Sequence, residues 1–385
     1  MRALLRNLLL ASLSCVFALL LAELVLRFGA HRIVRDGEWL EVGTVFDLDD
    51  PPVGFSLVPG STRISVKGGA YVIRDRISRQ GLRDVPHPEQ KLPGSVRVLV
   101  LGDSFMYGDG VKMEESMPRR LAAMIPGAEF INAGVRAWNL DQEYLYYKAR
   151  GRDWKPDVVL LAFFINDLIR DRAYEVVDGP EGLPIEYRRN AETRERDWRE
   201  RPRGLRGAVS SWLRRHSVLY ALVRSRLDGL ARHGPRGGVG ADAPRRPPEI
   251  PYLPIFSVQD PGSPAPPEWL RAYQVFDELK RLVTADGARL AVILVPAPWQ
   301  LTEESWRGWL DWLELDPGLY SRRGPVEMAT AWCERSQTPC LDLLDAFAGR
   351  EGERLYLAQD FHWTGEGHQV AAEAVRRWLA ARGIL

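Results

Sequence analysis

The sequence predicts an α/β fold built on one parallel β-sheet, preceded by a membrane-spanning helix. Two observations support this prediction. Five short apolar runs alternate with stretches long enough to hold helices, which is typical of strand–helix–strand units. Near the amino terminus, residues 8–26 form a separate apolar run of 19 residues whose single charged side chain is Glu23. A chain of 385 residues is long enough for such a domain together with additional segments.

The five apolar runs are expected to pair as a parallel sheet that helices cover on both faces, a flavodoxin-like three-layer arrangement. The third run is the most apolar and is therefore placed in the middle of the sheet. The runs lie at residues 96–101, 129–132, 158–164, 290–295 and 340–343. Apolar side chains at helical spacing predict helices near residues 114–125, 269–283 and 365–380. In such a sheet, a ligand site lies beyond the carboxyl ends of the strands.

The amino-terminal apolar run is interpreted as a single-pass membrane anchor, residues 1–32. As a helix, its 19 residues would span roughly 28 Å, close to the thickness of a bilayer core. Arg2 and Arg6 precede it, which favours a cytoplasmic amino terminus and places the rest of the chain in the periplasm or outside the cell. Two alternatives are less favoured. A cleaved signal peptide lacks a small-residue cleavage site, and a lipoprotein through Cys15 conflicts with the apolar run that continues past it.

Two further parts accompany the sheet domain, which is assigned to residues 94–385. Residues 33–93 contain short alternating runs broken by proline and glycine, which predicts a small β-rich leader. An arginine- and proline-rich insertion, residues 170–267, separates the third and fourth strands. Between Glu186 and Glu249 it holds 16 arginines and 8 carboxylates, a net charge of +8. It includes one predicted amphipathic helix, whose apolar positions are Leu219, Leu222, Val223, Leu227 and Leu230.

The insertion leaves two interpretations open. In the first, it is a cover over the site that also contacts an anionic lipid or polymer. In the second, which is favoured for most of its arginines, it is a solvated loop around one helix. The whole chain carries a formal net charge of only +1, so nothing in its composition indicates nucleic acid as a partner.

Three cysteines, at positions 15, 333 and 340, do not have the spacing of a metal site, and no metal ion is expected. Cys333 lies at the end of a predicted helix and Cys340 at the start of a predicted strand. A disulfide across the connecting loop and a pair of buried thiols are both compatible with this placement. Outside the cytoplasm, the two cysteines would enter an oxidising compartment.

Residues suited to acyl transfer follow the predicted strands. Ser104 comes after the first strand, Gly134 after the second and Asn166 after the third, while Asp360 and His362 lie close to the carboxyl terminus. Serine is a weak nucleophile until a base accepts its proton, and His362, oriented by Asp360, is the candidate base. The backbone N–H groups of Ser104 and Gly134 and the side-chain amide of Asn166 are the expected oxyanion donors. Each assignment has a structural alternative: a helix-end carboxylate for Asp360, a tight turn for Gly134 and a loop cap for Asn166.

These segments resemble the conserved blocks of the SGNH, or GDSL, hydrolase superfamily. In chain order they are Gly102-Asp103-Ser104, Gly134 within Asn132-Ala133-Gly134, Asn166-Asp167, and Asp360 with His362. The resemblance runs from about Gly54 to the end of the chain, apart from the insertion. It implies a serine hydrolase of esters, often of acyl groups on carbohydrates or lipids, that needs neither a metal nor an organic cofactor.

Two departures from the family pattern bear on the substrate. The third block has Phe164 where the family usually has glycine, and one residue instead of two separates Asp360 from His362. The shorter spacing, followed by Trp363, resembles exported bacterial polysaccharide O-acetyl esterases and transferases. The resemblance thus implies an esterase that removes O-acyl groups, expected to be acetyl, from a carbohydrate of the cell envelope. The alternatives are an O-acyltransferase acting on a glycan and a catalytically silent, membrane-tethered glycan-binding protein.

Aromatic residues near the predicted site are candidate substrate contacts. Trp299, Trp306, Trp309 and Trp312 follow the fourth strand at a spacing that fits one helical stripe. Such a stripe packs in a core or an interface more often than against a sugar. Trp299, together with Trp363, is nevertheless kept as a candidate substrate contact.

Three further polar residues of these segments are assigned no catalytic role. Asp103 and Asp167 are expected to hydrogen-bond the local backbone. His368 is expected on the surface of the last helix and not as a second base.

Overall fold

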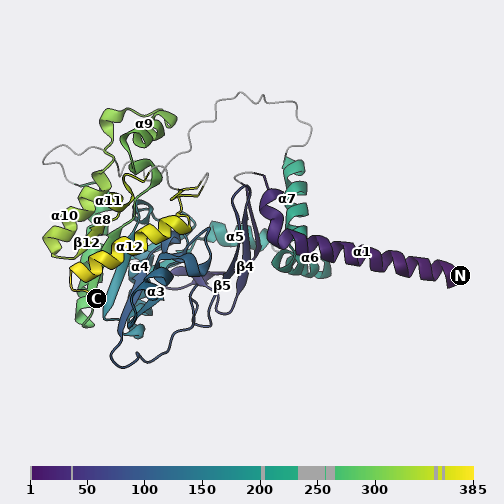
Figure 1. Cartoon of the computed structure of the whole chain (residues 1–385), viewed down its shortest axis with the longest axis horizontal. Helices are drawn as coiled ribbons and strands as arrows, with labels where there is room; N and C mark the ends of the chain where they lie inside the picture. The colour runs from purple at the N-terminus through teal and green to yellow at the C-terminus, as the bar shows by residue number, and fades with distance from the viewer. Residues whose placement is uncertain are drawn as a thin grey trace. The chain divides into compact units, whose positions relative to one another are not determined.

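Figure 1 shows the computed structural model of the chain. It describes residues 2–35, 38–200, 204–232, 256, 265–350, 354–357 and 360–385. Much of the predicted insertion, residues 233–255 and 257–264, lies outside these described residues. The chain divides into two compact units. The first unit comprises Met1–Val45, Ser61–Arg76 and Asp197–Ala243, and the second comprises Phe46–Gly60, Ile77–Arg196 and Pro244–Leu385.

The second unit is built on a five-stranded parallel sheet, which confirms the predicted fold class. The strand order is β7-β6-β8-β11-β12. The strands are β6 (Val96–Leu101), β7 (Ala128–Asn132), β8 (Val158–Phe163), β11 (Arg289–Leu294) and β12 (Cys340–Asp342). All six residues of β8 are buried, as expected for the most apolar strand at the centre of the sheet. Each predicted apolar run therefore forms one strand.

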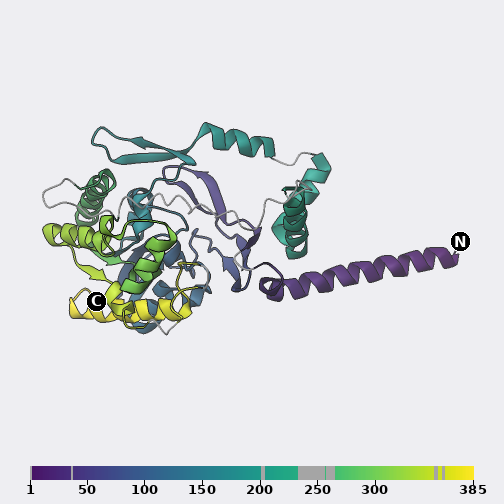
Figure 2. The same cartoon turned by 90° about the horizontal axis from the view of Figure 1, so that it is seen from above.

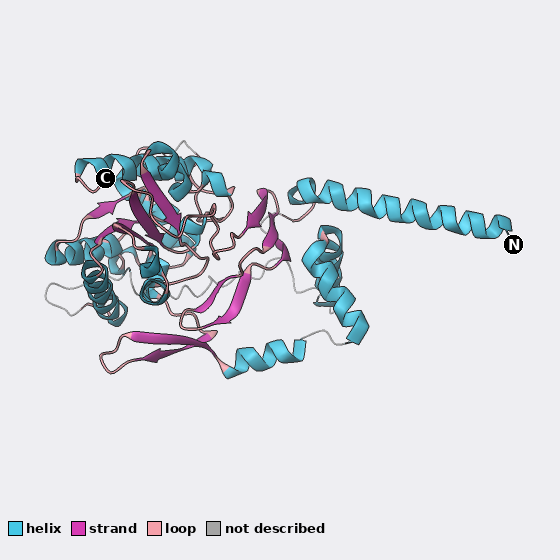
Figure 3. Ribbon diagram, turned by 90° about the horizontal axis from the view of Figure 1, so that it is seen from below, coloured by secondary structure: helices cyan, strands magenta, loops and turns pink. Residues whose placement is uncertain are grey.

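Helices cover both faces of this sheet, and Figure 3 shows the strands between them. α3 packs against β7 and α12, whereas α4 packs against α8. Apolar residues at helical spacing, among them Trp269, Phe276 and Val283, bury one side of α8. The longer helices are α3 (Met117–Met124), α4 (Leu140–Ala149), α8 (Pro267–Ala285), α9 (Glu303–Trp312), α10 (Gly324–Ser336) and α12 (Gly365–Ala381). α2 (Ser104–Tyr107) and α11 (Leu344–Phe347) are single turns, and α5 spans Ala191–Glu200.

Two antiparallel hairpins accompany the sheet. They pair β2 (Phe46–Asp50) with β3 (Gly54–Leu57), and β9 (Tyr174–Asp178) with β10 (Pro184–Arg189), the teal hairpin of Figure 2. The second hairpin lies within the stretch assigned to the insertion, and its strands were not predicted from the sequence. Tyr187 is 1% exposed, and its hydroxyl donates to Asp141 Oδ2 of α4 at 3.0 Å. One buried aromatic residue thus fastens this hairpin to a helix of the sheet domain.

Part of the predicted leader, residues 77–92, belongs to the second unit and contacts the edge strand β7. Asp84 Oδ2 accepts a hydrogen bond from the Asn132 backbone N–H at 2.8 Å. His87 lies between two carboxylates, with ring nitrogens 3.0 Å from Asp84 Oδ2 and 2.9 Å from Glu129 Oε1. These side chains cover part of an edge that would otherwise present unpaired backbone groups.

The first unit combines an antiparallel sheet, in the order β1-β4-β5, with three helices. Its elements are α1 (Arg2–Gly29), β1 (Trp39–Gly43), β4 (Thr62–Lys67), β5 (Tyr71–Arg76), α6 (Gly204–His216) and α7 (Val218–Arg232). Its core contains Leu26 of α1, Ala30 just after that helix, Val42 of β1 and Val218 of α7. Residues of the predicted anchor, leader and insertion therefore share one core.

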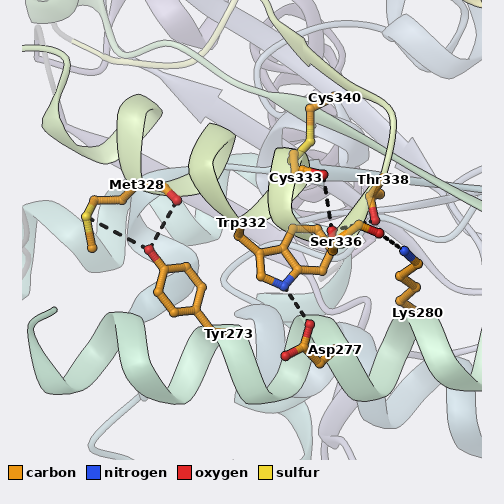
Figure 4. The surroundings of a disulfide bond; sticks show 9 residues. All are labelled: Tyr273, Asp277, Lys280, Met328, Trp332, Cys333, Ser336, Thr338 and Cys340. Atoms are coloured by element: carbon orange, nitrogen blue, oxygen red, sulfur yellow. Dashed lines mark hydrogen bonds between the residues drawn. A yellow bond between two sulfur atoms is a disulfide. The ribbon is translucent and has the colours of Figure 1, made fainter. Parts of the chain in front are cut away.

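Cys333 of α10 and Cys340 at the start of β12 form a disulfide. Their Cα atoms are 6.1 Å apart. Figure 4 shows the surroundings, in which the Trp332 Nε1–H donates to Asp277 of α8 at 2.8 Å and the Ser336 hydroxyl donates to the Cys333 carbonyl at 3.3 Å. Of the two alternatives that the sequence left open, the structure contains the disulfide.

We predict that replacing both Cys333 and Cys340 with serine lowers the free energy of unfolding by about 2 kcal/mol, because the disulfide restricts a short loop of the unfolded chain. Denaturant unfolding of the detergent-solubilised protein, followed by circular dichroism, measures the change. Cys15→Ser is the control, because Cys15 is exposed and outside the disulfide, and it should leave stability unchanged. Equal unfolding midpoints for the wild type and the double variant would contradict the prediction.

Candidate active site

Ser104 is the first residue of α2 and follows the turn that ends β6. A Cβ atom at Gly102 would lie 2.5 Å from Met106 Cγ, so this turn requires glycine. Asp103 caps α2, because its Oδ1 accepts a hydrogen bond from the Phe105 N–H at 2.9 Å. The local backbone bond expected for Asp103 is thus confirmed. The turn presents the Ser104 side chain at the carboxyl end of the sheet.

The side chains of Ser104, His362 and Asp360 form one hydrogen-bonded chain. Ser104 Oγ and His362 Nε2 are 2.7 Å apart, and His362 Nδ1 is 2.6 Å from Asp360 Oδ1. Asp360 Oδ1 also accepts a hydrogen bond from the His362 backbone N–H at 3.1 Å. With the proton of the neutral ring on Nδ1, facing the carboxylate, Nε2 is left to accept the hydroxyl hydrogen of Ser104. The structure therefore brings these three residues together.

The loop that carries His362 is fixed by backbone hydrogen bonds. The Leu357 N–H donates to the His362 carbonyl at 2.9 Å, and the Thr364 N–H donates to the Leu355 carbonyl at 2.9 Å. Thr364 then caps α12, since its hydroxyl accepts a hydrogen bond from the Gly367 N–H at 3.2 Å. These bonds limit the positions that the imidazole can take relative to the sheet.

Aromatic rings pack around the serine–histidine pair. The ring centroid of Phe105 lies 5.3 Å from that of His362 and 4.8 Å from that of Trp363. Trp363 has no exposed surface, and its ring also stacks on Phe347. The expectation that Trp363 contacts substrate is therefore corrected, because a fully buried side chain offers no face to a ligand.

Trp299 lies at the edge of an aromatic cluster. Its ring stacks on Trp309 with centroids 5.1 Å apart, and Trp309 stacks on Trp306 at 5.2 Å. Trp306 is buried, whereas Trp299 and Trp309 are half-buried. Trp299 also packs edge-to-face with Phe361, the residue before His362, with ring centroids 6.4 Å apart. Three members of the stripe thus pack on one another, whereas Trp312 is exposed, and Trp299 is the member that reaches the histidine loop.

The charges around His362 favour its protonated form. Burial alone would lower the pKa of His362, but the hydrogen bond to Asp360 and the charges of Asp109, Asp360 and Asp103 raise it above the ordinary histidine value. Asp109 is 4% exposed and forms an ion pair with Arg136 at 2.8 Å. Asp109 was not predicted, because an aspartate in the turn after α2 belongs to no motif of its own.

Two of the predicted oxyanion donors lie beside α2. A Cβ atom at Gly134 would lie 2.6 Å from Met106 Cβ, so only glycine lets this loop approach the helix so closely. The Gly134 N–H donates to Asn132 Oδ1 at 3.0 Å, and Asn132 Nδ2 donates to the Met106 carbonyl at 2.7 Å. The side chain of Asn166 hydrogen-bonds Asp103. Both predicted donors thus have an acceptor within the protein.

Three buried carboxyl groups, Asp103, Glu143 and Asp167, influence one another in this region. Burial raises the pKa of Glu143 well above the usual carboxyl range, and the charge of Asp103 raises it further. Burial also raises the pKa of Asp167, with the charge of Glu143 adding to the effect. Asp167 Oδ2 accepts a hydrogen bond from the Phe164 N–H at 2.7 Å, the local bond that was expected. Glu143 was not predicted, because its polar neighbours in the sequence give no sign that α4 is buried along nearly its whole length.

His368 is buried, and its predicted surface position is wrong. It is 1% exposed, and its Nδ1 accepts a hydrogen bond from the Met117 N–H of α3 at 3.2 Å. Burial lowers the pKa of His368 to about 3, and the charges of Arg120 and Arg83 contribute in the same direction. The sequence pattern did not indicate this burial, because it arises from the packing of α3 on α12. His368 is a neutral link between two helices.

The chain is similar to known proteins over much of the second unit. Residues 100–370 match the GDSL-like Lipase/Acylhydrolase family. The chain is also similar to the structure of a member of the lipolytic protein G-D-S-L family from Veillonella parvula DSM 2008, at 11% identity and a TM-score of 0.38, covering 74% of this chain and 97% of that one. The lipase/acylhydrolase from Enterococcus faecalis is similar at 11% identity and a TM-score of 0.38, with 74% and 96% covered. None of the curated proteins matches the chain.

Proposed function

Because this chain belongs to the GDSL-like lipase/acylhydrolase family and is a hydrolase of ester bonds, we propose that it is a membrane-anchored serine esterase acting outside the cytoplasm. Its substrate is an O-acyl group, expected to be acetyl, on a carbohydrate of the cell envelope. The observation that carries the proposal is the hydrogen-bonded chain from Ser104 Oγ through the His362 ring to Asp360. Nucleophile, base and orienting carboxylate stand within hydrogen-bond reach of one another, as acyl transfer requires.

In the acylation step, His362 Nε2 accepts the hydroxyl proton of Ser104 while Oγ attacks the ester carbonyl carbon. Asp360 stabilises the imidazolium through its hydrogen bond to Nδ1. When the tetrahedral intermediate collapses, the bond to the alcohol oxygen breaks, the alcohol takes the proton from His362, and the acyl group stays on Ser104. In deacylation, water gives a proton to His362 as its oxygen attacks the acyl carbon, and the carboxylic acid leaves as Ser104 regains its proton.

The oxygen that becomes negative in each tetrahedral intermediate needs preorganised donors. We assign this role to the backbone N–H groups of Ser104 and Gly134 and to the amide of Asn166. Since the Gly134 N–H also bonds Asn132 Oδ1, the oxyanion would share this donor with an acceptor of the protein. Loss of one such donor typically costs about 3 kcal/mol of transition-state stabilisation.

Transfer of the acyl group to a glycan is the second candidate function. It uses the same acyl-enzyme, but a sugar hydroxyl replaces water as the attacking group. The Asp360-Phe361-His362-Trp363 segment is the reason for considering this alternative, because it resembles polysaccharide O-acetyl transferases as well as esterases. Trp299, half-buried beside Phe361, supports a sugar substrate for either function, since an aromatic face can stack on a sugar ring.

The first unit supports a retained membrane anchor over a cleaved signal peptide. Residues Leu4–Arg32 form a helix long and apolar enough to cross a membrane. Leu26 and Ala30, near the end of this helix, are buried in the core of the first unit together with Val218 of α7. Cleavage at the end of the helix would remove both side chains from that core. The disulfide between α10 and β12 supports a location outside the cytoplasm, where such bonds persist.

We predict that Ser104→Ala abolishes the hydrolysis of p-nitrophenyl acetate and the labelling of the protein by a fluorophosphonate probe, because the variant lacks the oxygen that His362 activates. Ser95→Ala is the control. Ser95 is half-buried in the loop before β6, where its hydroxyl donates to the Leu92 carbonyl at 2.7 Å. Removing this hydroxyl should leave both signals unchanged. Labelling of the Ser104→Ala variant at the wild-type level would refute the nucleophile assignment.

We also predict that kcat/KM for p-nitrophenyl acetate falls as the pH drops through the pKa of His362, because only the neutral ring accepts the serine proton. The midpoint should lie above the ordinary histidine value of 6.5, since the hydrogen bond to Asp360 and the neighbouring carboxylates raise this pKa. Asp360→Asn should move the midpoint to lower pH and reduce the plateau by about 10⁴-fold. An unchanged midpoint in this variant would show that Asp360 does not control the protonation of His362.

A further inference from the structure

We propose that the hairpin of α6 and α7 in the first unit docks on the surface of an anionic phospholipid bilayer, beside the point where α1 leaves the membrane. The inference rests on the proposed anchor and concerns a different part of the chain, namely the described helices of the arginine-rich insertion. Three observations carry it: a set of hydrogen bonds that ties the hairpin to α1, an exposed apolar stripe on α6, and arginines on both sides of that stripe.

The junction between α6 and α7 is bonded to the last turns of α1. The Glu23 carboxylate accepts hydrogen bonds from the Ser217 hydroxyl at 2.8 Å and from the Val218 and Leu219 N–H groups at 3.0 Å each. These N–H groups lie at the amino end of α7, so the single charged residue of the apolar run serves as a helix cap. Arg27 pairs with Glu23 at 2.9 Å, and Figure 1 shows both hairpin helices beside this end of α1.

This contact places the hairpin close to the bilayer surface. Residues 4–21 of α1 are all exposed and, with the exception of Arg6 and Asn7, are small or apolar, so the lipid interior is the medium that fits them. Glu23 lies just beyond this stretch. α6 has 13 residues and is therefore about 20 Å long. α6 ends at His216, next to the Ser217 hydroxyl that bonds Glu23, so every residue of α6 lies within about 20 Å of α1. The whole helix therefore stays near the point where α1 would leave the membrane.

α6 carries an apolar stripe on the side that the first unit leaves open. Leu205, Val209 and Trp212 are 82%, 50% and 59% exposed, and their spacing of four and three residues places them on one face of the helix. Another side of α6 faces the protein: Gly207 is buried, and the hydroxyls of Ser210 and Tyr220 hydrogen-bond at 2.7 Å. α6 is therefore an amphipathic helix whose apolar face is exposed, apart from the contact of Trp212 with the His216 ring, which stacks on it at 4.8 Å.

The charges identify an anionic lipid surface as the partner. At about 100° of rotation per residue, Arg206 and Arg215 lie roughly a quarter-turn to either side of the apolar stripe, and both are exposed. A helix that lies in a bilayer interface has this arrangement, with apolar side chains and a tryptophan in the boundary and cations at the headgroups. Residues 204–232 hold six arginines and one aspartate, so the hairpin is strongly cationic. Anionic headgroups complement this charge.

The test uses the full chain with Cys15→Ser, in nanodiscs containing phosphatidylglycerol. A bimane label is attached at Trp212→Cys in one sample and at Trp312→Cys in the other, and lipids brominated near the headgroup act as quenchers. The pair is matched, because both tryptophans are 59% exposed and lie on helices, one on α6 of the first unit and one on α9 of the second. We expect the brominated lipids to quench the label at position 212. The label at position 312 gives the reference signal of an exposed helix position to which the proposal assigns no membrane contact.

A second variant tests whether the arginines beside the apolar stripe bind anionic headgroups. Arg206→Glu combined with Arg215→Glu should weaken the quenching at position 212 in phosphatidylglycerol discs, whereas p-nitrophenyl acetate hydrolysis should be unchanged. A label at position 212 that brominated lipid does not quench, in protein that is stably inserted, overturns the docking proposal and leaves the anchor intact. If the label were protected from aqueous iodide but not quenched by lipid, protein and not lipid would cover the stripe, which also overturns the proposal. Failure of the full chain to insert into nanodiscs would instead refute the anchor.

Discussion

The hydrogen bond between Ser104 Oγ and His362 Nε2 joins two side chains that lie 258 positions apart in the sequence, and the active-site architecture depends on it. One partner is placed by the turn at the end of β6, which Gly102 makes possible. The other is placed by the loop before α12, which backbone hydrogen bonds hold. The parallel sheet places Ser104 at the carboxyl edge of its strands, and the packing of α12 on α3 helps to bring the histidine loop to the serine. Buried His368 ties α12 to α3 and so helps to hold the histidine loop in place.

The strands and the central residues of the site could be predicted because their signals are local. An apolar run of β-branched residues forms a buried strand wherever helices cover the sheet, and a polar residue directly after such a run lies at the ligand-binding edge. Ser104 and Asn166 are found in this way. Asp360 and His362 follow no predicted strand directly. They were selected because an activated serine needs a base and an orienting carboxylate, and the family resemblance agreed with that selection.

The errors and omissions arise where burial depends on distant segments. Trp363 and His368 lie among polar residues in the sequence, but contacts with other elements bury both. Glu143 is a carboxylate on a helix that is buried on nearly all sides, and its neighbours in the sequence do not reveal this. The hairpin of β9 and β10 was missed because its strands are short and rich in charge. Its link to α4 depends on Tyr187, a single buried side chain.

The two compact units differ in the features they contain and in the stretches of sequence that build them. The second unit contains the parallel sheet and the serine–histidine–aspartate chain. The first unit takes its residues from three separate stretches, so that the end of α1 shares a core with strands of the leader and with α7. The Glu23 carboxylate of α1 caps α7, so the hairpin of α6 and α7 is bonded directly to the apolar amino-terminal helix. The arginine-rich insertion is thus a structural element in its described part and more than a solvated loop.

The central claim is that Ser104 carries the acyl group during turnover. The most direct measurement is mass spectrometry of peptides from protein that is acid-quenched during steady-state turnover of p-nitrophenyl acetate. The account predicts a mass gain of one acetyl group on the peptide that contains Ser104, absent from protein quenched before substrate is added. Steady hydrolysis with the acetyl group on a different side chain would contradict it.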